Sequence, residues 1–524
     1  MEMASSKRQF IKNVGSGWLT QTSAAVVGLI MLPYNLSHLG TEVYGISVLA
    51  VSAIAMLDFL NHGLGSALLR FFSQAIAKND QAEIASLSST SQAIVGGLGL
   101  FGCLVILAGI PWFLHFYEIA PTHHHETVIL LICLAITFFQ RFHAMVFANI
   151  LMASQRFDLV NFNSIFASWL RLALLIFFYA MFNPSLVQLG LATIVSNTFS
   201  YVTIIVLCFK RLGKSIFFSP RQVKLSRAPA VFSFSSVVMF DTIFFAASLQ
   251  LPVMIIGKIL GKEMAAFFSP AVLVASYFFS IMGQMAIPLA PIASRDLVEN
   301  QQKNIGRWAI LFGQIIAVFG YGCIVLSVLF MPDILRLWLG TDFMWTSATV
   351  TVLIAGSACM QIQTVNYNLA LGGSTIAPFA CRSVVMAILT SSGTLLGTMY
   401  WHWGILEVAV CITTTRILSD TFFLGGIYSR LFQYSFADYF FKVYIRPAFS
   451  GGILLIVALF CRHWPLAISF FVPKSVVRLG TEIIAVGCLY LGLTWAFGLS
   501  QATKELLFKK NSLISMRGTI KDEL

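Results

Sequence analysis

The stretch from residue 57 to residue 70 reads Leu57-Asp58-Phe59-Leu60-Asn61-His62-Gly63-Leu64-Gly65-Ser66-Ala67-Leu68-Leu69-Arg70. It closes an apolar segment that begins near Val43, and such a segment is typical of a membrane-spanning helix. It also carries an aspartate, and a charged side chain at the bilayer centre costs roughly 2.5–3.5 kcal/mol on insertion scales. Asp58 and His62 are four residues apart, so they share one helix face. We therefore expect this helix to line a polar cavity inside a membrane bundle.

The composition of the whole chain indicates the same class. Of the 524 residues, 58% are hydrophobic and 10% are charged, whereas soluble proteins carry about 25% charged residues. One membrane span needs about 20 apolar residues. We predict an all-α polytopic membrane protein with about 14 transmembrane helices, near 14–36, 44–68, 88–114, 127–150, 160–182, 186–209, 230–256, 266–290, 308–331, 345–370, 382–402, 404–428, 448–470 and 479–499.

The distribution of lysine and arginine predicts the orientation. Cytoplasmic loops are enriched in these residues, and this bias explains the net charge of +12 without a nucleic-acid partner. Loops on one side hold many of them: Arg70, Lys78, Arg156, Lys210, Arg211, Lys214, Arg221, Lys224, Arg227, Arg295, Lys303, Arg307, Arg382, Arg430, Lys442 and Arg446. Loops on the other side hold few: Lys258, Lys262, Arg336, Arg462, Lys474 and Arg478. We therefore predict cytoplasmic N- and C-termini and an even number of spans.

A short pattern occurs in both halves of the chain and suggests a duplication. Leu39-Gly40-Thr41-Glu42 follows the first predicted span, and Leu260-Gly261-Lys262-Glu263 follows the seventh. Six spans per copy give two lobes related by a pseudo-two-fold axis along the membrane normal, which is a transporter architecture. We predict an N-terminal six-helix lobe, a basic cytoplasmic linker, a C-terminal six-helix lobe, two additional helices and a cytoplasmic tail, at 1–209, 210–229, 230–428, 429–500 and 501–524.

Three stretches of the first half carry a family resemblance. They are Asn-Val-Gly-Ser-Gly-Trp at 13–18, Leu-Gly-Thr-Glu-Val-Tyr-Gly at 39–45 and Asp-Phe-Leu-Asn-His-Gly-Leu-Gly-Ser-Ala-Leu-Leu-Arg at 58–70. The chain thereby resembles the polysaccharide-transporter branch of the multidrug/oligosaccharidyl-lipid/polysaccharide exporter superfamily, which holds O-antigen and capsule flippases. Members often have Asp-x-Gly-Leu-Gly, whereas here the acid stands further back, at Asp58.

The resemblance implies a V-shaped two-lobed bundle in the bacterial inner membrane that works by alternating access. It implies transport of undecaprenyl-diphosphate-linked oligosaccharide, a unit of O-antigen lipopolysaccharide, capsule or exopolysaccharide, from the cytoplasmic to the periplasmic leaflet. Beside this lipid-linked oligosaccharide and membrane lipid, it suggests a polysaccharide polymerase and chain-length proteins as partners.

The basic residues within or at the edges of the spans are candidates for substrate binding. A lipid diphosphate is anionic, and guanidinium groups bind phosphate with two hydrogen bonds. Under the family resemblance, Arg141 and Arg171 would contact the head group, and Arg70 would meet it at the cytoplasmic mouth. Arg416 is a fourth candidate, although it stands one turn from Asp420, so the two can also form a structural ion pair.

The acids within the spans are candidates for ion coupling. Asp58 and Asp241 lack an obvious partner nearby in the sequence, and an isolated carboxylate in a low-dielectric site can take up a proton or hold a cation. We include His62, which could tune Asp58, and Asp420 in this group. The alternative is that these acids are buried and hydrogen-bonded for structural reasons.

Other functions remain open at this point. An ion-coupled drug/cation antiporter of the same superfamily is the main alternative, although deep arginines at least balance the deep acids. A glycan polymerase or ligase usually needs a large periplasmic loop, and the outer loops here are short. The sequence shows no nucleophile–base constellation, phosphate-binding glycine loop or metal-ligand spacing, so we expect no enzyme activity, cofactor or metal.

Overall fold

The computed structural model describes residues 2–57, 59–78, 80–216, 218–224, 228–286, 289, 302–373, 377–462, 476–500 and 503–504. In these ranges the regular structure is helical throughout, which agrees with the predicted all-α class. The chain forms two compact units. The first unit holds Met1–Leu273 and Ser383–Val408, and the second holds Val274–Arg382 and Ala409–Leu524. The predicted domain boundaries, with their linker at 210–229, stay a prediction.

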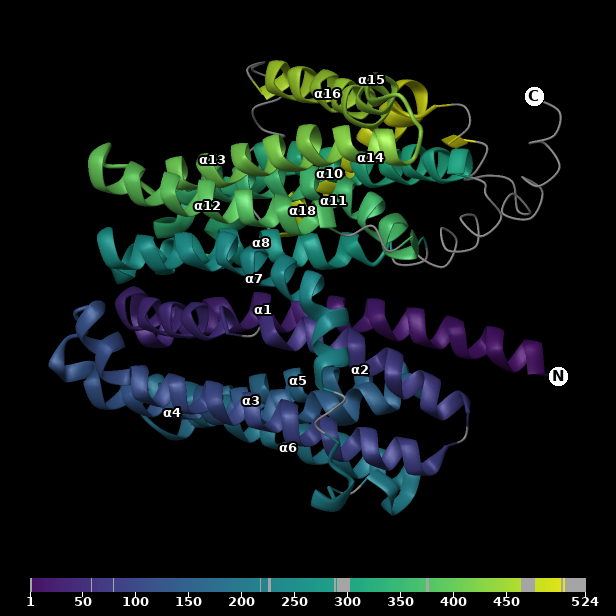
Figure 1. The fold of residues 1–524 in the computed structure, drawn as a ribbon. Helices are drawn as coiled ribbons and strands as arrows, with labels where there is room; N and C mark the ends of the chain where they lie inside the picture. The colour runs from purple at the N-terminus through teal and green to yellow at the C-terminus, as the bar shows by residue number, and fades with distance from the viewer. Residues whose placement is uncertain are drawn as a thin grey trace. The chain divides into compact units, whose positions relative to one another are not determined.

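The first unit is built from long helices that pack side by side (Figure 1). They are α1 (Glu2–Ala55), α2 (Phe59–Ala77), α3 (Gln81–Phe116), α4 (Pro121–Ala153), α5 (Phe157–Met181), α6 (Leu186–Leu212) and α7 (Ala228–Ile259), with the short helices η1 (Gly213–Ile216) and η2 (Pro220–Gln222). The unit also takes in the first half of α8 (Lys262–Gly283) and most of α12 (Ala377–Tyr400).

The second unit is also helical, with α10 packed along α11. Its elements are α10 (Gln302–Leu339), η4 (Thr341–Thr346), α11 (Ser347–Gly373), α13 (Ile405–Arg416), η5 (Ile417–Leu424), α14 (Gly425–Leu431), α15 (Phe436–Tyr439), η6 (Phe440–Ile445), α16 (Arg446–Arg462), α18 (Val476–Leu493) and η7 (Thr494–Gly498). Of these, η5, η6 and η7 are π-helices, a form that occurs often at functional sites.

The number of membrane spans agrees with the prediction once a kink in α1 is considered. The described residues contain thirteen helices long and apolar enough to cross a membrane, and Gly15–Ala55 is counted as one of them. This segment is two helices joined at Gly40, whose φ of 76° and ψ of 171° are not helical. With this segment divided at Gly40, the structure fits the expected number of about fourteen helices. Glycine suits this position because a positive φ costs it little.

The second predicted span differs from the expectation of one continuous helix. The apolar segment from Val43 to Arg70 is divided between α1, which ends at Ala55, and α2, which begins at Phe59. The amide of Leu57 donates to the carbonyl oxygen of Ile54 at 2.9 Å, so the last turn of α1 is tightened. A hydrogen bond between residues three apart is typical of a 3-10 turn, and here it closes the helix before the glycine-containing stretch begins.

Polar side chains join α5 to α1 inside the first unit. In a bundle surrounded by lipid, interhelical hydrogen bonds and close packing hold helices together because lipid chains are as apolar as the helix surfaces. Three side-chain hydrogen bonds link the two helices along their length, namely Asn161 to Ser16 at 2.8 Å, Trp169 to Ser23 at 2.8 Å and Tyr179 to Asn35 at 3.1 Å.

The two similar turns of the predicted duplication contact each other in the first unit. Gly40 and Gly261 both have a positive φ, 76° and 100°, so each Leu-Gly pattern places a glycine in a conformation that other residues rarely adopt. Gly45 packs directly on the backbone of Lys262, since a Cβ added to this glycine would lie 2.0 Å from the Lys262 carbonyl oxygen. The Nζ of Lys262 lies 3.3 Å from Oε1 of Glu42.

Candidate functional site

The second unit holds a buried ion pair between α12 and the π-helix η5. The Nε atom of Arg382 lies 3.4 Å from Oδ1 of Asp420, and the two side chains are 6% and 1% exposed. The guanidinium also lies over the ring of Phe379, 5.6 Å from its centroid, a distance typical of a cation–π contact. Charges so far from solvent occur where they are paired or functional.

A second guanidinium belongs to the same buried group. Arg416 ends α13 and is 5% exposed, and its Nη1 donates to the hydroxyl oxygen of Ser357 at 3.1 Å. Arg382, Arg416 and Asp420, here named the charge cluster, therefore combine two positive charges with one negative charge. A buried group with an excess positive charge is suited to an anionic ligand.

The local helix geometry explains why this cluster was only partly predictable from the sequence. The sequence analysis left open whether Arg416 and Asp420, one helical turn apart, form a structural ion pair. The chain from Ile417 to Leu424 is instead a π-helix, whose wider turns bond residue i to residue i+5. The carboxylate forms its ion pair with Arg382, a residue that sequence reasoning counted only among loop residues.

A buried polar network lies beside α11 in the same unit. Gln363 donates from Nε2 to the hydroxyl oxygen of Tyr444 at 3.1 Å, and Asn366 donates from Nδ2 to Oε1 of Gln363 at 2.6 Å. The same Asn366 amide lies 3.4 Å from the hydroxyl oxygen of Tyr439. These side chains are all buried. Buried polar groups of this kind need partners, and these hydrogen bonds hold α11 against α15 and η6.

In the first unit, the predicted ion-coupling residue Asp241 has a partner that the sequence did not reveal. Asp241 lies on α7 and is 9% exposed. The hydroxyl group of Ser383 on α12 donates to its Oδ1 at 2.6 Å. The sequence shows no partner near Asp241 because this partner lies 142 residues away in the chain. Because the hydroxyl group is neutral, this hydrogen bond does not balance the negative charge of the carboxylate.

The three predicted arginines of the first unit lie on separate helices. Arg70 on α2 and Arg141 on α4 are exposed, and Arg171 on α5 is half-buried. Asp58 and the side chain of His62 lie outside the described residues. The structure thus brings Arg416 together with Asp420, whereas the roles proposed for the other residues stay predictions.

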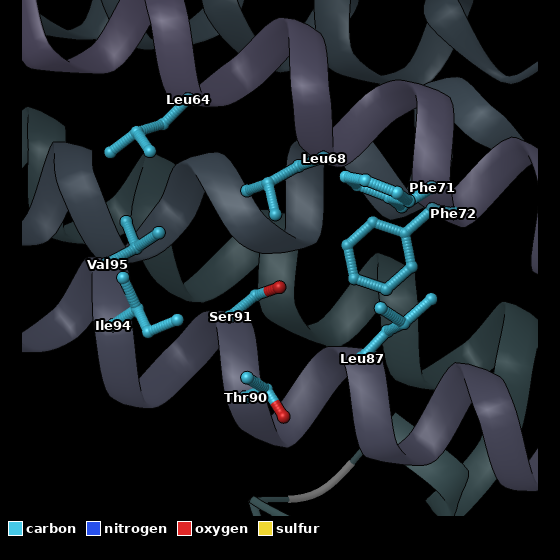
Figure 2. Close-up of a pocket in the computed structure, with 9 residues that line it drawn as sticks. All are labelled: Leu64, Leu68, Phe71, Phe72, Leu87, Thr90, Ser91, Ile94 and Val95. Atoms are coloured by element: carbon cyan, nitrogen blue, oxygen red, sulfur yellow. The ribbon is translucent and has the colours of Figure 1, made fainter. Parts of the chain in front are cut away.

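A narrow pocket between α2 and α3 receives side chains from the stretch at 57–70 (Figure 2). Figure 2 shows Leu64 and Leu68 of α2 opposite Ile94 and Val95 of α3. The lining is apolar apart from two hydroxyl side chains, Thr90 and Ser91. The pocket has room for about one water molecule. It is therefore no candidate for a phosphorylated sugar, and the charge cluster is the better-founded candidate site.

Comparison with known proteins identifies relatives of both the sequence and the fold. The model of a family described as polysaccharide biosynthesis protein matches residues 10–295, which are 286 of the 524 residues. No curated protein matches the chain.

Solved structures share the fold at low identity. The lipid II flippase MurJ, in an inward closed conformation, aligns with a TM-score of 0.70 and 10% identity over 91% of this chain and 97% of its own. An inward-facing multidrug resistance MATE family transporter of the MOP superfamily aligns with a TM-score of 0.67 and 14% identity, over 80% and 97%. The eukaryotic MATE transporter AtDTX14 gives 0.61 and 14%, over 83% and 98%.

Proposed function

Because the chain belongs to the polysaccharide biosynthesis protein family, we propose that it is a flippase for undecaprenyl-diphosphate-linked oligosaccharide. It moves an O-antigen, capsule or exopolysaccharide unit from the cytoplasmic to the periplasmic leaflet by alternating access. It is not an enzyme in this proposal. The single observation that carries the proposal is the family match over more than half of the chain. The fold shared with a protein named as a lipid II flippase supports it.

The proposed substrate explains why cations are retained inside an apolar bundle. A diphosphate carries several negative charges, and buried guanidinium groups bind it with charge-assisted hydrogen bonds. The exposed Arg70 and Arg141 and the half-buried Arg171 supply guanidinium groups in the first unit, and the buried Arg416 supplies one in the second. The excess positive charge of the charge cluster supports a role for Arg416 beyond a structural ion pair.

Ion coupling is the second part of the proposal. Asp241 is buried with one neutral hydroxyl donor at 2.6 Å, so a proton or a cation could balance its charge. Asp58, His62 and Asp420 are the other residues proposed for this step. Uptake of the ion would favour one conformation over the other, because a ligand shifts an equilibrium by its differential affinity for the two states.

An ion-coupled drug or cation antiporter is the alternative function. Its specific support is the fold shared with MATE family transporters, among them one named for multidrug resistance. In that case Asp241 would bind the cationic substrate or the coupling ion, and the arginines would have structural roles. The net positive charge cluster favours an anionic substrate instead.

A reconstitution experiment separates these functions. Purified protein in vesicles is given a fluorescent undecaprenyl-diphosphate oligosaccharide, and the fraction that reaches the other leaflet is measured with and without proton and sodium gradients. Translocation supports the flippase, and dependence on a gradient supports coupling. Drug efflux without translocation supports the antiporter. Chain lengthening of the glycan would instead indicate a polymerase and would contradict the proposal.

A deletion strain tests the site in the cell. We expect intracellular lipid-linked repeat units to accumulate and the wild-type gene to relieve this. Arg141→Ala and Arg171→Ala should fail to relieve it at wild-type protein levels in the membrane, whereas Arg307→Ala, a change at an exposed residue near the start of α10, should complement normally. Full complementation by both variants would remove the support for the head-group role. The proposal places both termini in the cytoplasm and the protein in the inner membrane beside a polymerase and chain-length proteins.

A further inference from the structure

The chain that leaves α6 folds back onto the first half of α3. This segment, residues 213–216 and 218–224, is named the strap here and includes η1 and η2 (Figure 1). Five hydrogen bonds tie its backbone to hydroxyl and amide side chains of α3, namely Ser86 to Gln222 O, Ser88 to Ile216 O and Gln92 to Ile216 O, each at 3.0 Å, Ser219 N to Ser89 at 3.1 Å, and Lys224 N to Thr90 at 3.0 Å.

The sequence of α3 explains this attachment. Residues 86–92 read Ser-Leu-Ser-Ser-Thr-Ser-Gln, and all seven are buried. Backbone groups outside long helices need other partners, and the short side chains of α3 supply them while letting the strap approach closely. Ile216 is fully buried and anchors the strap by packing as well. The strap is therefore a fixed part of the first unit.

The side chains on the outer side of the strap differ in character from those that attach it. Phe218 is 50% exposed, and the nearby cations are exposed too, namely Lys210, Arg211, Arg221 and Lys224. The sequence contains no acid between Asp158 and Asp241. The nearest acids of the helix that holds the strap are Asp80 and Glu83, and Asp80 is used as the cap of α3. The strap and the last turn of α6 thus carry an exposed aromatic ring and four exposed cations.

We propose that the strap is a binding surface for the anionic head groups of the cytoplasmic leaflet. Its charge complements an anionic lipid surface, to which juxtamembrane lysines and arginines are attracted. The exposed ring of Phe218 suits the boundary between head groups and acyl chains, where aromatic residues gather. Because the strap is bound to α3 by its backbone, little backbone freedom is lost when it binds lipid.

The test titrates phosphatidylglycerol or phosphatidylcholine into the full-length protein in detergent and follows thermal unfolding. We expect phosphatidylglycerol to raise the melting temperature of the wild type more than phosphatidylcholine, and high salt to remove the difference. A variant with Lys210→Gln, Arg211→Gln, Arg221→Gln and Lys224→Gln should bind phosphatidylglycerol at least about tenfold more weakly, since each cation near an anionic surface contributes about fivefold.

A matched variant removes the same charge elsewhere. The matched variant changes four exposed cations outside the strap, with Lys12→Gln, Lys78→Gln, Arg307→Gln and Arg430→Gln. The phosphatidylglycerol concentration that gives half of the maximal stabilisation, here called the lipid midpoint, should stay at the wild-type value. A charge-preserving variant, with Lys210→Arg, Arg211→Lys, Arg221→Lys and Lys224→Arg, should behave as the wild type. If the first variant folds poorly, the four substitutions are made singly, and each single variant should retain fewer phosphatidylglycerol molecules in native mass spectrometry than the matched variant does.

Three outcomes would overturn the proposal. The strap variant could keep the wild-type midpoint, or the matched variant could lose as much affinity, which would assign the effect to overall charge. Soluble glycerol phosphate or inorganic phosphate could stabilise the protein as well as phosphatidylglycerol does, which would indicate a site for a free anion. None of these readouts depends on transport, so failure here leaves the proposed flippase function untouched.

Discussion

One ion pair from each unit differs strongly from the other in its exposure to solvent. In the second unit, Arg382 and Asp420 lie 3.4 Å apart with side chains only 6% and 1% exposed. In the first unit, Lys258 and Glu118 are closer, at 2.7 Å, but are 34% and 81% exposed. The distance between the charges therefore does not decide which ion pair matters more for stability. The surroundings decide it, because water and salt screen the exposed pair, whereas each buried charge depends on its partner.

The exposed pair belongs to a network at one end of the first unit. Glu118 stands between α3 and α4, and Lys262 at the start of α8 donates to its carbonyl oxygen at 3.2 Å. The hydrogen bond from Lys258 lowers the pKa of the Glu118 carboxyl. Lys262 also contacts Glu42, beside the packed Gly45. The tight backbone contact of Gly45 and the solvent-exposed ion pairs thus lie close together. Their contributions to stability can be measured separately by mutating Gly45 or Glu118.

The largest effect is expected from Asp420→Asn. This change leaves two buried guanidinium groups of the charge cluster without their carboxylate, and removing one partner of a buried pair costs about 3–5 kcal/mol. Unfolding by dodecyl sulfate in mixed micelles measures the loss. Asp438→Asn is the matched control, since it breaks the exposed pair with Lys442, 2.7 Å apart, and should cost less than about 1 kcal/mol. Equal losses would show that burial does not separate the two kinds of pair.

A smaller loss is expected from Gly45→Ala. The added methyl group would meet the backbone of Lys262, which cannot rotate away as a side chain can, and overpacking costs about 1–3 kcal/mol. The control is Gly97→Ala on α3, where nothing lies within 4 Å of the added carbon and where alanine favours the helix. If both variants were equally stable, the contact between the two similar turns would not be a tight one.

Arg416→Gln tests whether the second unit's cluster serves more than stability. The change leaves Arg382 and Asp420 as a balanced pair and loses the hydrogen bond to Ser357, so we expect a loss of about 1 kcal/mol or less. Translocation of the lipid-linked oligosaccharide should fall at least about tenfold, the equivalent of about 1.4 kcal/mol of binding. A variant that transports normally but unfolds as easily as Asp420→Asn would show a structural role only.

The smallest effect is expected at Glu118. Because its pKa is lowered in the folded state, its ionised form stabilises the fold at pH values above the pKa of the unfolded chain, and this contribution is lost as the pH falls through the lowered pKa. Glu118→Gln should therefore melt slightly below the wild type at neutral pH and low salt, and at the same temperature in acid. A difference that persisted in acid or in high salt would contradict this explanation.

The sequence predicted the fold and the family well, and the site only in part. The helical class and the number of about fourteen helices are confirmed, since the described residues hold thirteen candidate spans and one of them is divided at Gly40, and the family match confirms the resemblance. The site partners Arg382 and Ser383 were missed although they are adjacent in the chain. Polar side chains at the beginning of a predicted span indicate a possible buried site, but hydropathy does not predict which residues a side chain contacts.

What the sequence by itself determined follows from local physics. Runs of apolar residues must form helices in lipid because each backbone polar group needs a partner within the segment, and glycines at 40 and 261 permit turns that other residues resist. Only the tertiary structure decided which charge meets which. Arg382 reaches Asp420 and Ser383 reaches Asp241 because packing, together with the π-helical register of η5, places residues far apart in the chain within bonding distance.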